Sequence, residues 1–192
     1  TYSVFEENLP EGWNLSDISC GETETEVWGN QVTLDVKTGD EINCTFTNKQ
    51  DNTVVVHKYE DLNRNGQYDE SEQMLPDWDF TLARGNDCEV VDVFVRQLFS
   101  EVEPPSDNCS PESASQTKAT GEDGTATFTG VKPDSSYKLS EEIPSDSKWN
   151  LGSVDCGEGL GSLDGDTFYF DSESMGAGNT INCWVGNYRT PV

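Results

Sequence analysis

Residues 61–72 carry oxygen-bearing side chains at the spacing of a calcium-binding loop. The candidate ligands are the side chains at loop positions 1, 3, 5, 9 and 12 and the backbone carbonyl at position 7: Asp61, Asn63, Asn65, Asp69, Glu72 and Gln67. Ca²⁺ takes roughly six to eight oxygen ligands, and Gly66 at position 6 permits the sharp turn that gathers them around one centre. The alternative is an Asn- and Gly-rich turn that binds no ion. Because six positions agree at once, we expect Ca²⁺ as a cofactor.

The segments on either side of this loop indicate strands. Residues 53–59 are rich in β-branched side chains, and residues 78–82, which follow Pro76, alternate between apolar and polar. A helix–loop–helix calcium sensor is therefore not expected. The ion would instead stabilise a loop that joins two strands.

Short alternating segments separated by turn residues continue along the chain. They lie at residues 32–36, 41–46, 125–128, 137–140, 167–170 and 180–185. This pattern, without long helical periodicity, predicts an all-β fold of the β-sandwich type. Residues 89–103 fit a strand or a helix equally well, and the polar residues 104–116 are expected to form an exposed connection.

The chain also contains an internal repeat. The stretch from Tyr2 to Asn48 and the stretch from Tyr137 to Asn187 contain the same motifs in the same order, allowing for short insertions. These motifs are Tyr-x-x-x-Glu-Glu, Pro, Trp-Asn-Leu, Cys-Gly-Glu and Ile-Asn-Cys. Residues 1–49 therefore match only the second half of residues 50–192. We expect one complete module preceded by the C-terminal half of another. The missing strands would come either from an adjoining part of a tandem array or from another polypeptide, because a half-module leaves a sheet edge unpaired.

The six cysteines follow the repeat. Repeat symmetry selects three disulfides: Cys20–Cys44, Cys156–Cys183 and Cys88–Cys109. The absence of Cys-x-x-Cys spacing argues against zinc, and free thiols in a cytosolic protein are the remaining alternative. Disulfides mark an oxidising compartment, so we expect a secreted or cell-surface protein. Triplets that permit glycosylation occur at Asn14, Asn43 and Asn108.

The charge excludes several classes of partner. The chain has 37 acidic and 11 basic residues, which gives a net charge of -26. Such a chain cannot release counterions from DNA or RNA, so no nucleic acid is expected as a partner, and adhesion to anionic membranes is disfavoured. No apolar stretch approaches the roughly 18 residues of a membrane span, so direct membrane insertion is not expected either.

Several of these segments resemble a known family. Residues 123–141, with Pro144 and Trp149, are similar to the prealbumin-like, SpaA-like B-type repeats of bacterial collagen adhesins and pilins. Residues 54–58 and the loop up to residue 78 resemble the calcium-binding B repeats of Gram-positive surface adhesins. The resemblance implies prealbumin-like, Ig-like β-sandwich modules in tandem. The cysteine-bracketed insert at residues 88–109 is a departure from the family pattern.

The resemblance also implies a covalent crosslink. Many such domains form an isopeptide bond between a Lys of the first strand and an Asn of the last, assisted by a carboxyl group, and Lys58, Asn187 and Glu141 occupy the matching positions. The alternative is a solvated Lys, a turn-capping Asn and an ordinary surface Glu. In the first module Glu6 and Asn48 are retained, but their Lys would lie in the missing half.

Together these features predict a non-enzymatic, calcium-stabilised and disulfide-linked structural module of an extracellular stalk, adhesin or filament. Its partners would be neighbouring modules of the same protein or identical subunits in a filament. The alternative is an adhesin module that binds a carbohydrate or a host protein through the insert at residues 86–116. A hydrolase is less favoured, because His57 is the only histidine and no carboxylate pair stands out.

Overall fold

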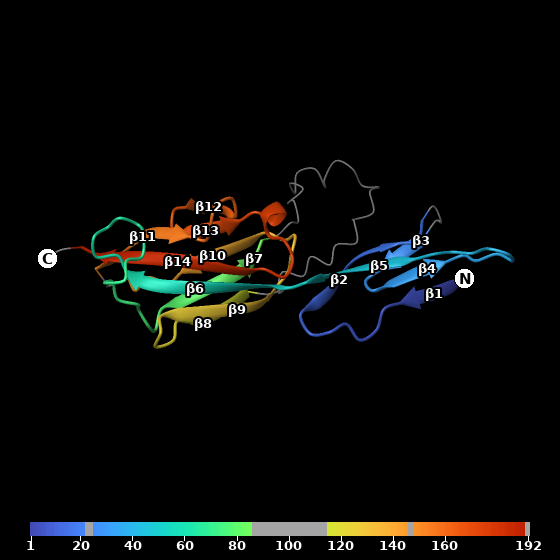
Figure 1. The fold of residues 1–192 in the computed structure, drawn as a ribbon, viewed down its shortest axis with the longest axis horizontal. Coiled ribbons are helices and arrows are strands. Elements are labelled where there is room, and N and C mark those ends of the chain that lie inside the picture. Colours follow the sequence, from blue (N-terminus) through green and yellow to red (C-terminus); the bar gives the residue numbers. More distant parts are fainter. Residues whose placement is uncertain (22–24, 86–114, 146–147, 191–192) are drawn as a thin grey trace, which may run out of the picture. The chain divides into compact units, whose positions relative to one another are not determined.

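The chain forms two separate units. The structure is a computed structural model that describes residues 1–21, 25–85, 115–145 and 148–190. The first unit ends at residue 51 and the second begins at residue 52 (Figure 1), whereas the sequence predicts a boundary after residue 49. The predicted insert, the Cys88–Cys109 disulfide and the segment at residues 89–103 lie outside the described residues.

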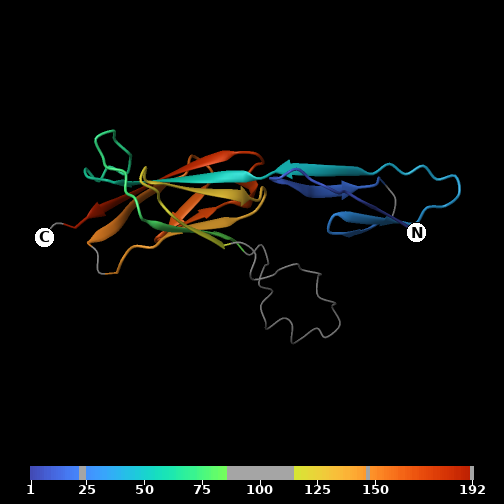
Figure 2. The ribbon, with the colours of Figure 1, turned by 90° about the horizontal axis from the view of Figure 1, so that it is seen from below.

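The first unit contains two small antiparallel sheets. Its strands are β1 (Tyr2–Phe5), β2 (Trp13–Ser19), β3 (Thr25–Trp28), β4 (Gln31–Leu34) and β5 (Thr45–Gln50). One sheet has the order β1-β4-β3, and the other is the pair β2-β5 (Figure 2). A small core of Cys20, Val32 and Leu34, joined by partly buried apolar residues, packs between them.

The described residues of the second unit form a β-sandwich. Its elements are β6 (Asn52–Glu60), β7 (Asp79–Arg84), β8 (Ser115–Ala119), β9 (Thr125–Val131), β10 (Tyr137–Glu141), β11 (Trp149–Asp155), β12 (Gly161–Asp164), β13 (Thr167–Phe170), the short 3-10 helix η1 (Ser172–Ser174) and β14 (Thr180–Arg189). The strand orders of its two sheets are β12-β13-β10-β7-β8 and β11-β14-β6-β9. Among the described strands of this unit, all pairings are antiparallel except that of β14 with β6, which is parallel.

The core of the second unit lies between its two sheets. Alternate side chains of β6, β9 and β14 meet those of β7, β10 and β13, and the largest fully buried apolar members include Phe80, Leu82, Phe128 and Phe170. Strands with one buried face produce the alternating sequence pattern from which the fold was predicted. The all-β prediction is confirmed for the described residues.

The strands of the first unit pair with one another in the same register as the repeat-equivalent strands of the second unit. The pair β2-β5 matches β11-β14, down to a bulge at the same place: Leu15 and Asp17 face Asn48 and Thr47, as Leu151 and Ser153 face Asn187 and Gly186. The sheet β1-β4-β3 likewise matches β10-β13-β12. No described strand of the first unit corresponds to β6, β7, β8 or β9.

Two sequence predictions about strands are corrected. Residues 41–46 were predicted as one strand, but β5 begins only at Thr45. The equivalent strand of the second unit, β14, begins three residues before Cys183, because Thr180 already pairs with Thr53 of β6. In the first unit, no described strand takes the place of β6 beside β5. The exposed connection predicted at residues 104–116 is also wrong at its end, because Ser115 and Gln116 already belong to β8, which pairs with β7.

Candidate functional site

Three polar side chains converge in the core of the second unit. Lys58 lies on β6, and its register partner on the adjacent parallel strand β14 is Val185. Asn187 is two residues further along β14, so both side chains point to the same face of the sheet. Glu141 ends β10 in the facing sheet. The side chains of Lys58 and Asn187 have no exposed surface, and that of Glu141 retains only 3%.

The Glu141 carboxyl lies between the other two groups. Its Oε1 is 2.6 Å from Lys58 Nζ, and its Oε2 accepts a 2.9 Å hydrogen bond from Asn187 Nδ2. The contact to Lys58 is an ion pair by distance only, because neither Nζ nor Oε1 makes a hydrogen bond of acceptable geometry. Asn187 Oδ1 is also buried without a donor. Buried polar atoms without partners cost folding free energy, so their presence in one cluster indicates a functional site.

An aromatic side chain lies against the lysine. The ring centroid of Trp78 is 4.6 Å from Lys58 Nζ, and Trp149 packs edge-on against Trp78 at 5.4 Å. Burial lowers the pKa of Lys58 from 10.5 to about 8, although the negative Glu141 nearby opposes this shift. The lysine is therefore far more easily converted to a nucleophilic amine than a solvated lysine is.

The first unit contains two of the three groups. Asn48 Nδ2 donates a 2.8 Å hydrogen bond to Glu6 Oε1, as Asn187 does to Glu141 in the second unit. Glu6 Oε2 and Asn48 Oδ1 are buried and unpartnered. No described residue of this unit takes the place of Lys58.

The predicted calcium loop is ordered around two buried carboxylates, Asp61 and Glu72. The two oxygens of Asp61 accept from the backbone N–H groups of Asn65 and Gly66 at 3.1 and 2.9 Å. Glu72 accepts from the N–H groups of Leu62 and Asp69 at 2.9 and 3.1 Å. Gly66 has a φ of +74°, which is the turn that a glycine at position 6 permits.

The remaining predicted ligands belong to the same loop. Asn63 and Asn65 each donate from Nδ2 to Asp69 Oδ2, at 2.6 and 3.1 Å, and Asn65 Oδ1 accepts from the N–H of Gln67 at 2.8 Å. The described residues contain no cluster of three or more His, Cys, Asp or Glu side chains converging as a metal centre. The donor set itself fits Ca²⁺, since every predicted ligand atom is an oxygen.

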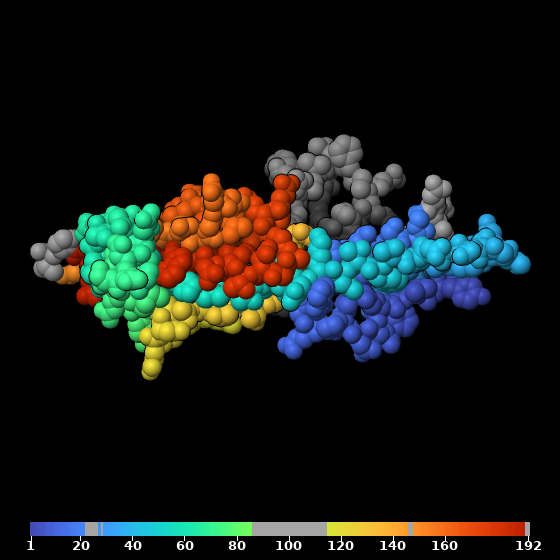
Figure 3. All heavy atoms as spheres, viewed as in Figure 1, coloured from blue at the N-terminus to red at the C-terminus, as the bar shows by residue number. Residues whose placement is uncertain are grey.

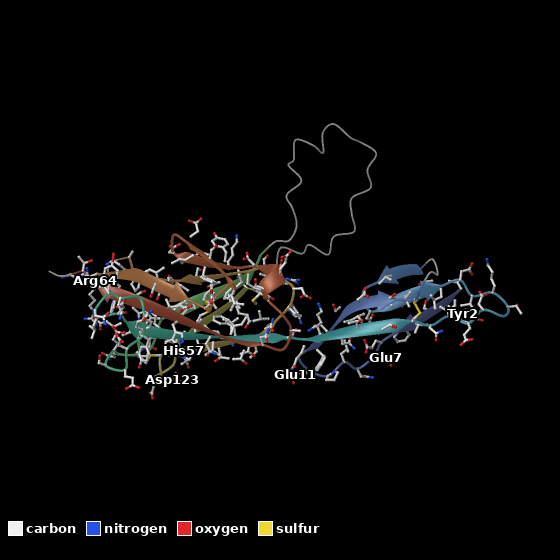
Figure 4. All side chains as sticks on the ribbon, turned by 45° about the horizontal axis from the view of Figure 1, so that its top comes forward. Tyr2, Glu7, Glu11, His57, Arg64 and Asp123 are labelled. Atoms are coloured by element: carbon white, nitrogen blue, oxygen red, sulfur yellow. A yellow bond between two sulfur atoms is a disulfide. The ribbon has the colours of Figure 1, made fainter. Side chains whose placement is uncertain are left out.

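The loop is attached to the last strand of the sandwich. Tyr68 stacks on Trp184 at 4.9 Å, and Trp184 stacks on His57 at 4.3 Å. The Arg64 guanidinium lies over the ring of Tyr188 and donates to a backbone carbonyl at the end of β14. Figure 3 shows the loop in green against one end of the red strand β14, and Figure 4 labels Arg64 within it.

The other predicted residues are the disulfide cysteines and the glycosylation triplets. The disulfides Cys20–Cys44 and Cys156–Cys183 are both formed. Of the glycosylation triplets, Asn43 is exposed, Asn14 is a partly buried residue of β2, and Asn108 falls outside the described residues.

Throughout the part of the chain that the structure describes, no helix has the length and apolar character needed to cross a membrane.

Comparisons with known proteins agree with the predicted fold. Residues 1–50 match the family model of a prealbumin-like fold domain, which confirms the resemblance for that part of the chain. No curated protein matches the sequence.

Three solved structures are similar at low identity. The shaft pilin SpaA from Lactobacillus rhamnosus GG is 14% identical over 74% of this chain and 52% of that chain, with a TM-score of 0.43. The full-length major pilin SpaD from Corynebacterium diphtheriae is 14% identical over 73% of this chain and 32% of that chain, with a TM-score of 0.39. A Mobiluncus mulieris adhesin with intramolecular disulfide, isopeptide and ester crosslinks is 12% identical over 89% of this chain and 55% of that chain, with a TM-score of 0.44. The matched region thus spans about half the length of the shaft pilin.

Proposed function

We propose that this chain is a structural segment of an extracellular pilus, adhesin or stalk, in which Lys58 and Asn187 become joined by an amide bond. The observation that carries the proposal is the fully buried cluster in which one carboxyl contacts both the lysine and the asparagine, at 2.6 and 2.9 Å. Such a covalent crosslink suits a surface stalk, because a bond between the first and last strands of a module resists mechanical unfolding.

The chemistry uses only groups of this chain. Lys58 gives one proton to Glu141, and its lone pair attacks the side-chain carbonyl carbon of Asn187. The bond from that carbon to Nδ2 breaks, and Nδ2 takes a second Lys58 proton and leaves as ammonia. The new amide keeps the third. The reaction happens once in each chain, because its nucleophile is consumed.

The environment favours each step. An ion pair that is out of contact with water is costly, so proton transfer from Lys58 to Glu141 relieves a buried charge on both partners. The protonated carboxyl can then donate a hydrogen bond to the Asn187 carbonyl oxygen and polarise it. Asn187 Oδ1 has no hydrogen-bond donor in the structure. A rotation of the carboxamide exchanges the positions of its oxygen and nitrogen and places Oδ1 where it can accept from the Glu141 carboxyl.

Calcium has a separate role in this proposal. A Ca²⁺ ion would be held by the predicted loop ligands, and its positive charge would neutralise the buried carboxylates of Asp61 and Glu72. The loop closes the end of the sandwich at which β6 and β14 carry their reactive residues. Binding that is restricted to the folded state stabilises it by mass action.

Protein–protein contacts in a filament complete the proposal. The net charge of -26 favours an extracellular, cation-rich setting and disfavours non-specific self-association. The partners that we expect, on the resemblance to pilins and adhesins, are neighbouring modules or identical subunits.

The direct test is to map the crosslink by mass spectrometry. Digestion of the purified chain should yield one branched peptide that contains Lys58 and Asn187 and weighs about 17 Da, the mass of one ammonia, less than the sum of its two linear parts. The matched control is the Lys58→Arg variant, which keeps the charge and removes the amine. Linear Lys58 and Asn187 peptides as the only products in the wild-type digest would refute the proposal.

A further inference from the structure

Both reactive strands are hydrogen-bonded to the ends of the predicted calcium loop. The backbone N–H of Asp61, the first loop residue, donates to the backbone carbonyl of Asn187 at 2.8 Å. The residues after the loop run back along β6, where the N–H of Leu75 donates to the backbone carbonyl of Lys58 at 2.9 Å. Figure 1 shows the loop at the place where β6 and β14 both end. The loop therefore starts beside one reactive residue and returns to the other.

The pairing of β6 with β14 ends at the reactive asparagine. Asn187 and Glu60 form the last register pair between these strands, and the bond from Asp61 is the next one along. The ends of paired elements open most readily, because fewer neighbouring bonds hold them. The position of Asn187 relative to Lys58 therefore depends on how firmly Asp61 is held.

Buried carboxylates stand at the two ends of the loop. Asp61, at loop position 1, is 2% exposed, and Glu72, at position 12, is 7% exposed. Carboxylates that are withdrawn from water carry a desolvation cost, which a cation bound by both of them offsets. Such an ion would also fasten the loop end attached to Asn187 to the loop end that leads back to Lys58.

Amide formation depends on small displacements at this place. Attack on a carboxamide needs the two reacting atoms about 3–3.5 Å apart and aligned, and a misplacement of about 1 Å can slow a reaction about 100-fold. The packing beside Asn187 is equally close, since a Cβ on Gly186 would lie 2.6 Å from the ring of the buried Tyr59. A small shift of β14 along β6 is therefore enough to separate the lysine amine from its target.

We propose that calcium binding to residues 61–72 controls the crosslinking reaction: the closed, ion-bound loop aligns Lys58 with Asn187, and the amide forms rapidly only in that state. This inference rests on the proposed amide and gives the ion a role beyond stabilising the folded chain. The bond changes are those described above, and the ion is not consumed. A chain would thus remain uncrosslinked where free calcium is scarce and react once it reaches a calcium-rich medium.

The test follows the reaction in time. Full-length chain recovered in denaturant at its full sequence mass is refolded under oxidising conditions in calcium or in chelator, and samples are quenched for intact-mass measurement. We expect the loss of about 17 Da, one ammonia, to be about 10- to 100-fold faster in calcium. Tryptophan fluorescence measures folding in the same samples, so that each rate is taken from the moment at which the chain is folded.

A pair of loop variants shows whether the ion acts through this site. Glu72→Gln lacks a buried carboxylate at a predicted ligand position and should react at the slow rate in both media. Glu70→Gln lacks an exposed carboxylate that is not a predicted ligand and should respond to calcium as the wild type does. A calcium effect of equal size in the two variants would overturn the proposal.

A second readout does not depend on the reaction. The Asn187→Ala chain cannot form the amide but keeps the backbone carbonyl to which Asp61 donates. Calcium should slow hydrogen exchange of the Asp61 amide in this chain by about tenfold or more. By reciprocity, the crosslinked wild type should bind calcium about fivefold or more tightly than Asn187→Ala does. Unchanged exchange, or equal affinities, would contradict the connection between the loop and the reactive pair.

The outcomes separate this inference from the proposed function. Loss of one ammonia at the same rate in calcium and in chelator, once the chain is folded, would refute calcium control and leave the amide intact. A chain that keeps its full sequence mass in both media would refute the amide and, with it, any control of its formation.

Discussion

The backbone N–H of Asp61 donates a 2.8 Å hydrogen bond to the backbone carbonyl of Asn187. The first residue of the predicted calcium loop is thus bonded to the residue whose side chain is proposed to receive the amide. This bond extends the parallel pairing of β6 and β14 by one residue beyond the Asn187–Glu60 register pair. The position of the loop and the position of Asn187 are therefore not independent.

Calcium removal should lower the thermal stability of the second unit. An ion that binds only the folded state adds about 2.7 kcal/mol at one hundred times its dissociation constant. We expect a chelator to lower the melting temperature by several degrees in a calorimetric scan. The melting temperature of the Glu72→Gln variant should be the same with and without calcium, because this variant lacks a buried carboxylate that is predicted to bind the ion.

The matched control for this loss is Glu70→Gln, which removes an exposed carboxylate at a loop position that is not a predicted ligand. This variant should respond to calcium as the wild type does. Equal melting temperatures for the wild type in calcium and in chelator would rule out a stabilising site.

The stability of an amide-free chain should depend on pH through Lys58. Burial lowers its pKa in the folded state to about 8 from the 10.5 of an unfolded lysine, so the unfolded chain holds more protons between these values. The free energy of unfolding of Asn187→Ala should accordingly rise as pH increases from about 8 towards 10.5, by about 3 kcal/mol at most.

Denaturant titrations across that pH range would measure this rise. Other groups also titrate there, so the control is Lys58→Met in the same Asn187→Ala background, which lacks the buried amine. A pH profile that is identical in the two variants would show that Lys58 is not the source.

Much of this site could be predicted from the sequence because its residues belong to local motifs or repeats. The Asp61–Glu72 loop has a fixed spacing, and Glu141 and Asn187 recur as Glu6 and Asn48. The structure brings Glu141 into contact with Lys58 and Asn187 as the resemblance implies. Such patterns are short in sequence, so no knowledge of the packing is needed to find them.

The contacts that connect these motifs could not be predicted. Trp78 lies against Lys58, and Tyr68 stacks on Trp184, only because the sheets pack in one particular way. Strand β8 was missed because its sequence, Ser-Gln-Thr-Lys-Ala, has almost no apolar alternation, and it is a strand through its pairing with β7. Long-range pairing of this kind leaves no signal in a single sequence.

The Cys156–Cys183 disulfide and the proposed amide should partly replace each other. Both restrain β14, and a native disulfide that closes a loop of this size contributes about 2–4 kcal/mol. Replacing both cysteines by alanine should lower the melting temperature less in the wild-type background than in Asn187→Ala. Equal losses in the two backgrounds, measured by calorimetry, would mean that only one of the ties is present or that they act independently.

Gly186 should be required for the geometry of Asn187. A Cβ at this position would lie 2.6 Å from the ring of the buried Tyr59, so the Gly186→Ala variant must displace either the ring or β14. We expect a loss of about 1–3 kcal/mol in stability and slower amide formation after refolding, followed by mass spectrometry. Gly165→Ala is the control, because a Cβ there meets nothing within 4 Å although its φ is +62°. If both variants formed the amide at the wild-type rate, the close packing at Gly186 would be irrelevant to the reaction.

The most direct measurement is the intact mass of the purified chain with its disulfides reduced. The proposed amide predicts a mass about 17 Da below that of the sequence, one ammonia and not two, because no described residue from 1 to 51 occupies the place of Lys58. The Lys58→Arg variant should show its full sequence mass. A wild-type chain at its full sequence mass would contradict the crosslink on which the proposed function depends.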